Sequence, residues 1–136
     1  MINTREIGAD KERIARTFLE QNNVKILEQN YHFHKIGEID LIGKCSESYI
    51  TPIVNKTIEY LVFFEVKYRK RDSRGAAVFA VDKKKQRQIV RVAEGYLKAK
   101  GINGNIPIRF DVIAIDGEKI DWIKNAFYGY WSLALY

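Results

Sequence analysis

The chain has 136 residues, of which 46% are hydrophobic and 29% are charged, with a net charge of +6. This length and composition are typical of a soluble globular protein, and we expect one domain over residues 1–136. No apolar run approaches the ~20 residues that a membrane span needs, so no membrane partner is expected. One cysteine, Cys45, and two histidines exclude an intrachain disulfide framework and the usual spacing of a zinc site. Charged residues interrupt the start where a signal peptide would be apolar, and the expected location is the cytoplasm.

Positive charge is unevenly distributed along the chain. Residues 67–100 carry twelve Lys and Arg residues against three acids, a local balance of +9, and the remainder of the chain is −3. One strongly positive segment is typical of a polyanion binder, and it favours nucleic acid as a partner. A solvated basic face is the alternative that composition alone leaves open.

The first predicted element is a helix over residues 4–22, in which apolar residues recur at helical spacing. Thr4 can cap its start. Glu12 lies at the border of the apolar stripe and not on the outer face of the helix. A strand over residues 24–33 is predicted to follow.

Residues 37–43 are predicted to form a strand that carries two acids. On a regular strand Glu38 and Asp40 share one face, while Ile39 and Leu41 share the other. Two carboxylates on one face repel each other, and this arrangement favours a cation between them. A polar edge strand is the alternative, although the flanking aliphatic residues favour a central position.

Residues 61–67, Leu-Val-Phe-Phe-Glu-Val-Lys, form the most informative stretch. Apolar, β-branched and aromatic residues predict a strand that is buried on both faces. Glu65 and Lys67 are two residues apart and therefore project from the same face. Burying an unpaired charge costs several kcal/mol, so the pair needs a partner, a metal ion or an open cleft. A structural Glu–Lys pair on a half-exposed strand is the alternative.

Two polar segments flank this strand. Residues 45–60 are predicted to be a long, irregular hairpin connection that contains short strand pieces. Residues 68–75 are predicted to be a basic loop, and its candidate contacts to nucleic acid are Arg69, Lys70, Arg71 and Arg74. Phosphates are the expected target, because no helix-turn-helix or zinc finger is present to read bases.

A second helix is predicted over residues 82–100, with Asp82 as its N-cap and Gly101 after its end. Three lysines in its first turn oppose the helix macrodipole, but they add to the attraction of the free N–H groups for phosphate. Gln86 lies on the buried-side stripe and is expected to point toward the same cleft as Glu65. The candidate phosphate contacts on this helix are Lys83, Lys84, Lys85 and Arg87.

A further strand is predicted over residues 108–115, where Asp111 is interpreted as a structural charge, paired with Arg109 or capping a turn. The end of the chain, residues 125–136, is strongly aromatic. Core cover or the seam of a homodimer is the expected use of these rings, with base stacking as the alternative.

An acid late in one strand followed by Glu-x-Lys in the next resembles the pattern of the PD-(D/E)xK nuclease superfamily. A longer set of motifs resembles the YraN-like family (uncharacterised protein family 0102), which is related in fold to archaeal Holliday junction resolvases. The motifs are Gly8-x-x-Lys11-Glu12-x-x-Ala15, Asn30-Tyr31, Gly37-Glu38-Ile39-Asp40-Leu41-Ile42, Phe63-Phe64-Glu65-Val66-Lys67-x-Arg69, Arg109-Phe110-Asp111-Val112 and Asn125-Ala126-Phe127. Two features depart from the family: Lys11 stands where Gly is usual, and the connection over residues 45–60 is longer.

The resemblance implies a restriction-endonuclease-like α/β fold, a three-layer α-β-α core with a central mixed sheet of about four to five strands flanked by helices. It implies Mg²⁺ or Mn²⁺ as cofactor, held by Asp40, Glu65 and the backbone carbonyl of Val66. Lys67 would orient or deprotonate the attacking water and offset charge in the transition state. Glu12 resembles the extra acid of the resolvase-like branch, and Gln86 would be an accessory contact to water or phosphate.

Two functions of different classes follow. The first is a metal-dependent endonuclease that hydrolyses phosphodiester bonds in duplex or branched DNA, and the second is a non-catalytic nucleic-acid-binding module that keeps the nuclease fold. A small-molecule enzyme is not supported, because the chain has no glycine-rich cradle or nucleophile motif. The endonuclease requires Asp40, Glu65 and Lys67 to meet at a notch that admits a cation and a phosphodiester.

Overall fold

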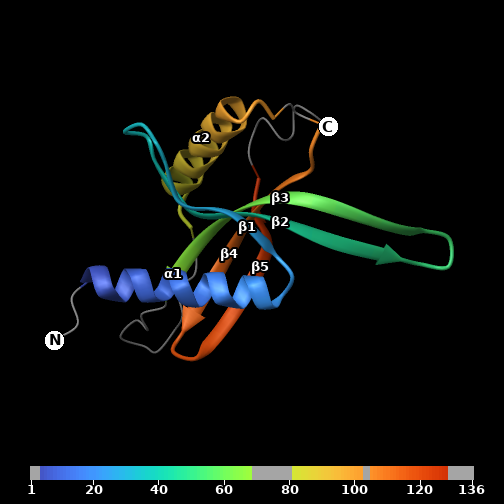
Figure 1. The fold of residues 1–136 in the computed structure, drawn as a ribbon, viewed down its shortest axis with the longest axis horizontal. Coiled ribbons are helices and arrows are strands. Elements are labelled where there is room, and N and C mark those ends of the chain that lie inside the picture. The colour runs from blue at the N-terminus through green and yellow to red at the C-terminus, as the bar shows by residue number, and fades with distance from the viewer. Residues whose placement is uncertain (1–3, 69–80, 103–104, 129–136) are drawn as a thin grey trace.

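The computed structural model describes residues 4–68, 81–102 and 105–128, with side chains from residue 10 onward (Figure 1). Its elements are α1 (Thr4–Gln21), β1 (Lys25–Phe33), β2 (Gly37–Ile50), β3 (Asn55–Tyr68), α2 (Lys83–Ala99), β4 (Ile108–Asp116) and β5 (Lys119–Phe127). The strands form one sheet in the order β1-β2-β3-β4-β5. β3 and β4 are parallel, with α2 between them in the sequence, and all other neighbours are antiparallel.

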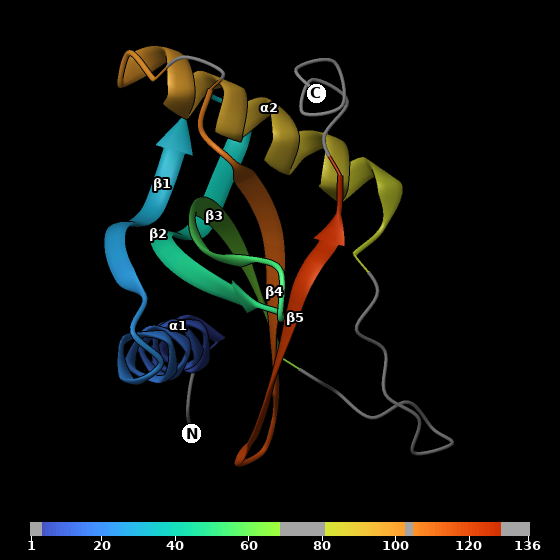
Figure 2. The ribbon, with the colours of Figure 1, turned by 90° about the vertical axis from the view of Figure 1, so that its right-hand side faces the viewer.

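The two helices lie on opposite sides of the sheet (Figure 2). α1 packs Ala15 and Leu19 in one core with strand residues such as Phe64. α2 packs Ile89 in a second core with strand residues such as Phe63. Neighbouring residues of β3 thus enter different cores, because successive side chains of a strand point to opposite faces. The predicted α/β fold with a mixed central sheet is confirmed, and the arrangement is consistent with a three-layer core.

The predicted end of α1 and both predicted ends of α2 are confirmed, whereas the Thr4 cap stays a prediction because its side chain lies outside the described residues. α1 ends at Gln21, and Asn23 follows in the left-handed region with φ 65°. Asp82 accepts a hydrogen bond from the backbone N–H of Lys85 at 2.8 Å and so caps the start of α2. Gly101, with φ 65°, follows the helix in a conformation that glycine adopts without strain. Neither helix, within the described ranges, has the length and apolar character needed to cross a bilayer.

The hairpin predicted over residues 45–60 is confirmed, but the prediction that it is irregular is wrong. β2 continues to Ile50 and β3 begins at Asn55, so this stretch is a two-stranded arm with a short turn (Figure 1). Cross-strand contacts stabilise it, such as the 3.0 Å hydrogen bond between the hydroxyls of Tyr49 and Tyr60. The polar sequence suggested a loop because most side chains of the arm are exposed, and no buried face imposes an apolar alternation.

β2 does not keep a regular alternation beside β1. Ile39 packs in the core under α2, whereas Leu41 packs in the core under α1, so the expectation that they share one face is wrong. In the neighbouring strand Asn30 has φ 52°, a left-handed conformation that interrupts regular strand geometry. The end of the β1–β2 hairpin consequently lies beside α2 (Figure 1). There the Gln88 side chain donates a hydrogen bond to the Ile36 carbonyl at 2.7 Å.

Candidate active site

Asp40 lies where β2 and β3 separate. The backbone pairing of these strands ends with Leu41 opposite Phe64. At the next position of β2, the Asp40 carboxylate takes the place of a backbone carbonyl and accepts a hydrogen bond from the N–H of Val66 at 2.7 Å. This bond holds the carboxylate at the point where the two strands diverge.

Asp40 and Glu65 lie close together at this point, and each carboxylate acts on the pKa of the other. Glu65 is 8% exposed, and Asp40 is partly exposed. Burial and then the charge of Glu65 raise the pKa of Asp40 to about 7. Burial likewise raises the pKa of Glu65. The pair therefore retains a proton close to neutral pH, and a bound cation could replace that proton.

Two lysines from different elements lie near Glu65. Their positive charges, first that of Lys85 and then that of Lys67, oppose the rise that burial causes in the pKa of Glu65. Lys67 follows Glu65 on β3, as the Glu-x-Lys spacing predicts. Lys85 comes from the first turn of α2, and the sequence predicted only a phosphate contact for it. The available signal was its position four residues before the buried Ile89, which places it on the inner side of the helix.

Gln86, the neighbour of Lys85, has a different hydrogen-bond partner. Its side chain donates to the carbonyl of Val81 at 2.8 Å, just before the start of α2. Its predicted contact to water or phosphate stays a prediction.

α1 brings a third acid toward the pair. The charges of Glu12 and Glu38 both contribute to the raised pKa of Asp40, after the larger effects of burial and Glu65. The Lys11 ammonium lies 3.7 Å from the centre of the Tyr68 ring, which places this part of α1 beside the end of β3. The sequence-predicted position of Glu12, at the inner border of α1, thus brings its charge within reach of Asp40.

The donor groups suit a hard divalent cation. In the described part of the chain no three side chains of His, Cys, Asp or Glu are grouped to hold a metal ion, so the side-chain ligands would be Asp40 and Glu65 alone. Mg²⁺ commonly takes one or two carboxylates and keeps several waters. The N–H and C=O of a strand residue project to the same side, so the Val66 carbonyl is directed toward Asp40 as its N–H is. These three residues fit Mg²⁺ or Mn²⁺.

The predicted phosphate contacts are only partly within the described residues. Lys83, Lys84 and Arg87 are exposed on the first turns of α2, and Lys85 is partly buried. The loop residues Arg69, Lys70, Arg71 and Arg74 lie outside the described residues. Sequence reasoning missed Lys35 and Arg91, which line a hollow together with Lys84 and Arg87. The fold brings Lys35 there from the turn between β1 and β2, and no sequence signal linked it to α2.

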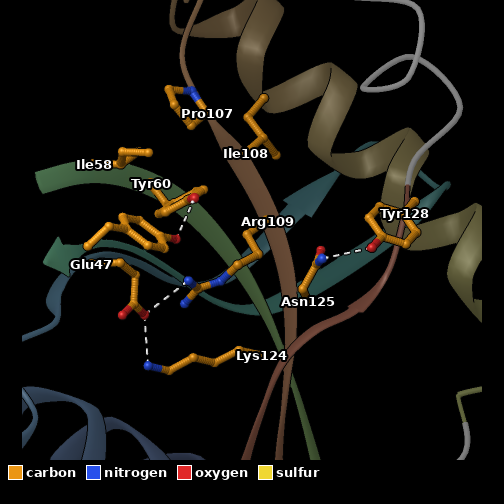
Figure 3. Close-up of a pocket in the computed structure, with 10 residues that line it drawn as sticks. Glu47, Ile58, Tyr60, Pro107, Ile108, Arg109, Lys124, Asn125 and Tyr128 are labelled. Carbon is orange, nitrogen blue, oxygen red and sulfur yellow. Dashed lines mark hydrogen bonds and ion pairs between the residues drawn. The ribbon is translucent and has the colours of Figure 1, made fainter. Parts of the chain in front are cut away.

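Asp111 belongs to a separate group of charges. It is fully buried and accepts hydrogen bonds from the Arg109 guanidinium at 2.8–3.1 Å, from the Trp122 Nε1–H at 2.8 Å and from the backbone N–H of Asn125 at 2.9 Å. Arg109 also donates to Glu47 at 3.1 Å (Figure 3). The interpretation of Asp111 as a structural charge paired with Arg109 is confirmed.

A hollow of about 600 Å³ opens beside this group, where the arm joins the sheet (Figure 3). Its charged groups are already paired, because Glu47 binds both Arg109 and, at 2.7 Å, Lys124. Asp40 and Glu65 do not line this hollow. We therefore assign it to the structural joint between the arm and β4, and the candidate site to the Asp40–Glu65 pair.

Comparison with known proteins identifies the family. The model of the uncharacterised protein family UPF0102 matches residues 11–115, which include Asp40, Glu65 and Lys67. A UPF0102 protein of Fusobacterium nucleatum is 39% identical over 128 residues, 94% of this chain and 96% of its own. One from Vibrio parahaemolyticus is 38% identical over 128 residues, 93% and 95% of the two chains, and one from Legionella pneumophila is 36% identical over 126 residues, 91% and 96%. Because the family model and these relatives cover most of its length, the chain belongs to the uncharacterised protein family UPF0102.

Proposed function

We propose that this protein is a metal-dependent endonuclease that hydrolyses phosphodiester bonds in duplex or branched DNA. The observation that carries the proposal is the position of Asp40 at the point where β2 and β3 diverge, where the Val66 N–H holds its carboxylate and the nearby charge of Glu65 raises its pKa. Two acids that face each other lose stability through burial and repulsion, and a purely structural site would instead pair each acid with a base. A divalent cation removes this penalty.

The residues around Asp40 and Glu65 can each take a separate role in hydrolysis. Asp40, Glu65 and the Val66 carbonyl would hold Mg²⁺ or Mn²⁺, which when bound supplies Lewis acidity and lowers the pKa of a coordinated water. Lys67 would orient the attacking water and offset negative charge that develops on the phosphoryl oxygens. Lys85 would contribute a second positive charge from the side of α2.

The distribution of charge supports DNA as the substrate. The first turns of α2 present Lys83, Lys84 and Arg87 to solvent, and Lys85 links this surface to Glu65. Cations that neutralise phosphates supply affinity without reading sequence. A substrate held in this way would be chosen by its shape and not by its bases.

A non-catalytic nucleic-acid-binding module is the second candidate, and one observation favours it. Asp40 already accepts a hydrogen bond from the Val66 N–H, and the charges of Lys85 and Lys67 act on Glu65, which is only 8% exposed. In such a module the lysines would bind phosphate and the acids would only complete the sheet. The two candidate functions differ in whether Lys67 and Glu65 contribute to cleavage of DNA or only to its binding and to the sheet.

The test uses end-labelled duplex and four-way-junction DNA with Mg²⁺ or Mn²⁺. We expect the wild type to cleave at least one of them. Glu65→Gln and Lys67→Ala should each lower the cleavage rate by about 10²–10³-fold, because each removes a group that acts on the reacting phosphate. DNA affinity, measured without a divalent cation, should change by less than about three-fold, since neither substitution removes more than one phosphate contact.

Glu59→Gln is the matched control. Glu59 is exposed on the same strand, and its substitution removes the same charge, so the cleavage rate should be unchanged. A wild type that is folded and binds both DNAs but cleaves neither with either cation would contradict the endonuclease and favour the binding module.

A further inference from the structure

A second hollow lies between α2 and the turn that joins β1 to β2. It measures about 680 Å³ and is lined by Lys35, Ile36, Asp82, Lys84, Lys85, Arg87, Gln88 and Arg91. Figure 1 shows this turn, at the far end of the β1–β2 hairpin from α1, beside the helix. The hollow therefore combines two segments that are distant in the sequence.

The hollow is strongly positive. Five cations line it against the single acid Asp82, whose carboxylate already accepts a hydrogen bond from the backbone N–H of Lys85. Among the described residues no ion pair joins Lys35, Arg87 or Arg91 to an acid. Cations that lie close together without acids repel one another, and a bound anion would relieve this repulsion.

Close packing of the β1–β2 turn against α2 forms the hollow in the absence of a ligand. The Gln88 amide donates to the Ile36 carbonyl at 2.7 Å and ties the turn to the helix. A Cβ atom at Gly37 would lie 2.7 Å from the Gln88 side chain, and one at Gly95 would lie 2.6 Å from the Phe33 ring. At Gly95 a side chain would collide with the Phe33 ring, and at Gly37, where φ is 156°, it would displace the Gln88 side chain that makes this hydrogen bond. The turn therefore holds Lys35 against α2 without a ligand.

Lys85 connects this hollow with the candidate active site. Its side chain lines the hollow, and its charge acts on Glu65. Arg87 and Arg91 are one turn apart on α2, so their guanidinium groups lie on the same side of the helix. A negatively charged chain that passes from the Asp40–Glu65 pair across Lys85 would meet these two residues next.

We infer that this hollow is a phosphate subsite, which holds a phosphate group of the DNA strand whose scissile bond lies at the acid pair. The inference rests on the proposed function for the position of the scissile bond. Arginine suits this ligand because its planar guanidinium can donate two parallel hydrogen bonds to phosphate. The phosphate is either an internal diester or the monoester at a strand end, and both present the same anionic oxygens.

The experiment measures the affinity of the full chain for fluorescent single-stranded and duplex oligonucleotides over a range of salt concentrations, without divalent cations. The test variant is Arg87→Gln/Arg91→Gln. The matched control is Lys25→Gln/Lys98→Gln, which removes the same charge from exposed positions that do not line the hollow. We expect the test variant to bind about ten-fold more weakly. The slope of log affinity against log salt concentration should become shallower by about one to two, while the control changes affinity by less than about two-fold.

A single substitution in the other wall provides an independent check. Lys35→Gln changes the exposed turn and leaves α2 intact, so it should reduce the salt slope by about one even if the double variant folds poorly. Equal losses in the test and control variants, or no loss with Lys35→Gln, would overturn the phosphate subsite.

Paired oligonucleotides with and without a 5′- or 3′-terminal phosphate separate the two sources of the ligand. Tighter binding of a phosphorylated end, lost in Arg87→Gln/Arg91→Gln, identifies a terminal monoester, and equal binding of all ends identifies an internal diester. The proposed function fails separately. If the wild type cleaves no DNA while the hollow variants still lose affinity selectively, then the hydrolysis is wrong and the subsite stands.

Discussion

Asp111 on β4 and Glu65 on β3 are both acids buried in the same sheet, 0% and 8% exposed. Their partners are opposite in kind. Asp111 accepts hydrogen bonds from the Arg109 guanidinium, from an indole N–H and from a backbone N–H, so its charge is balanced by donors. Glu65 lies beside Asp40, which is another acid, and the nearby charges of Lys85 and Lys67 do not reverse the rise that burial causes in its pKa.

This difference separates two uses of a buried charge. Burial lowers the pKa of Arg109, but the hydrogen bonds and charge of Asp111, together with the hydrogen bond to Glu47, outweigh burial and raise that pKa, so the guanidinium stays charged. Burial raises the pKa of Asp40 to about 7, and no base reverses the shift. A buried acid with a complete set of donors stabilises the fold, whereas two buried acids that face each other need a proton or a cation. Burial alone does not distinguish these cases, and the chemistry of the partner does.

The largest effect on stability is expected for Asp111→Asn. The substitution leaves the Arg109 guanidinium buried without a carboxylate at its main contact, and the free energy of unfolding should fall by about 3–5 kcal/mol. Urea unfolding at pH 7 measures the change. Glu118→Gln, an exposed acid in the turn between β4 and β5, should change it by less than about 0.5 kcal/mol. A loss below about 1 kcal/mol for Asp111→Asn would contradict the structural role of this charge.

Asp40→Asn should have the opposite effect in metal-free protein. Because the pKa of Asp40 is raised from 3.8 to about 7, the folded state binds more protons than the unfolded state between these values. The stability that the raised pKa of Asp40 contributes to the folded state is therefore fully present below pH 3.8 and is lost as pH rises toward 7. At pH 8 the variant should be more stable than the wild type by about 4 kcal/mol, with little difference at pH 4, as urea unfolding at both pH values would show.

Mg²⁺ sharpens this prediction. A cation that binds only the folded state stabilises it in proportion to the logarithm of its concentration. Mg²⁺ should raise the melting temperature of the wild type at pH 8 and leave that of Asp40→Asn nearly unchanged. If the variant is less stable than the wild type at pH 8 without Mg²⁺, then the acids are a stabilising pair and the contrast with Asp111 is wrong.

Glu47→Gln is expected to show the smallest effect, with the pH dependence reversed. A hydrogen bond from Lys124 outweighs partial burial and lowers the pKa of Glu47. Its contribution is therefore present above the ordinary pKa of a glutamate and is lost as pH falls through the lowered value. At pH 7 the variant should be about 1 kcal/mol less stable than the wild type, and the difference should shrink as the pH falls below 4.5 and through the lowered pKa. A difference that persists at low pH would mean that packing, and not charge, accounts for the effect.

Part of the candidate site could be predicted from local patterns. The Glu-x-Lys spacing and the apolar strand around it indicated Glu65 and Lys67, and the helical stripe of α1 indicated Glu12. Lys85 was only partly predicted, because its distance from Glu65 depends on how α2 crosses the sheet. Lys35 was missed because its contact with α2 depends on the bend of the β1–β2 hairpin at Asn30.

The local sequence was sufficient to predict the two helices, because they depend on periodicity and capping residues. The mixed sheet was expected from the family resemblance, and the pairing of Asp111 with Arg109 was one of two alternatives that the sequence allowed. Only the tertiary structure decided that residues 45–60 form an arm, that Ile39 and Leu41 enter different cores and that Asp40 meets Glu65. Those outcomes depend on strand register and twist, which are set by contacts between residues far apart in the chain.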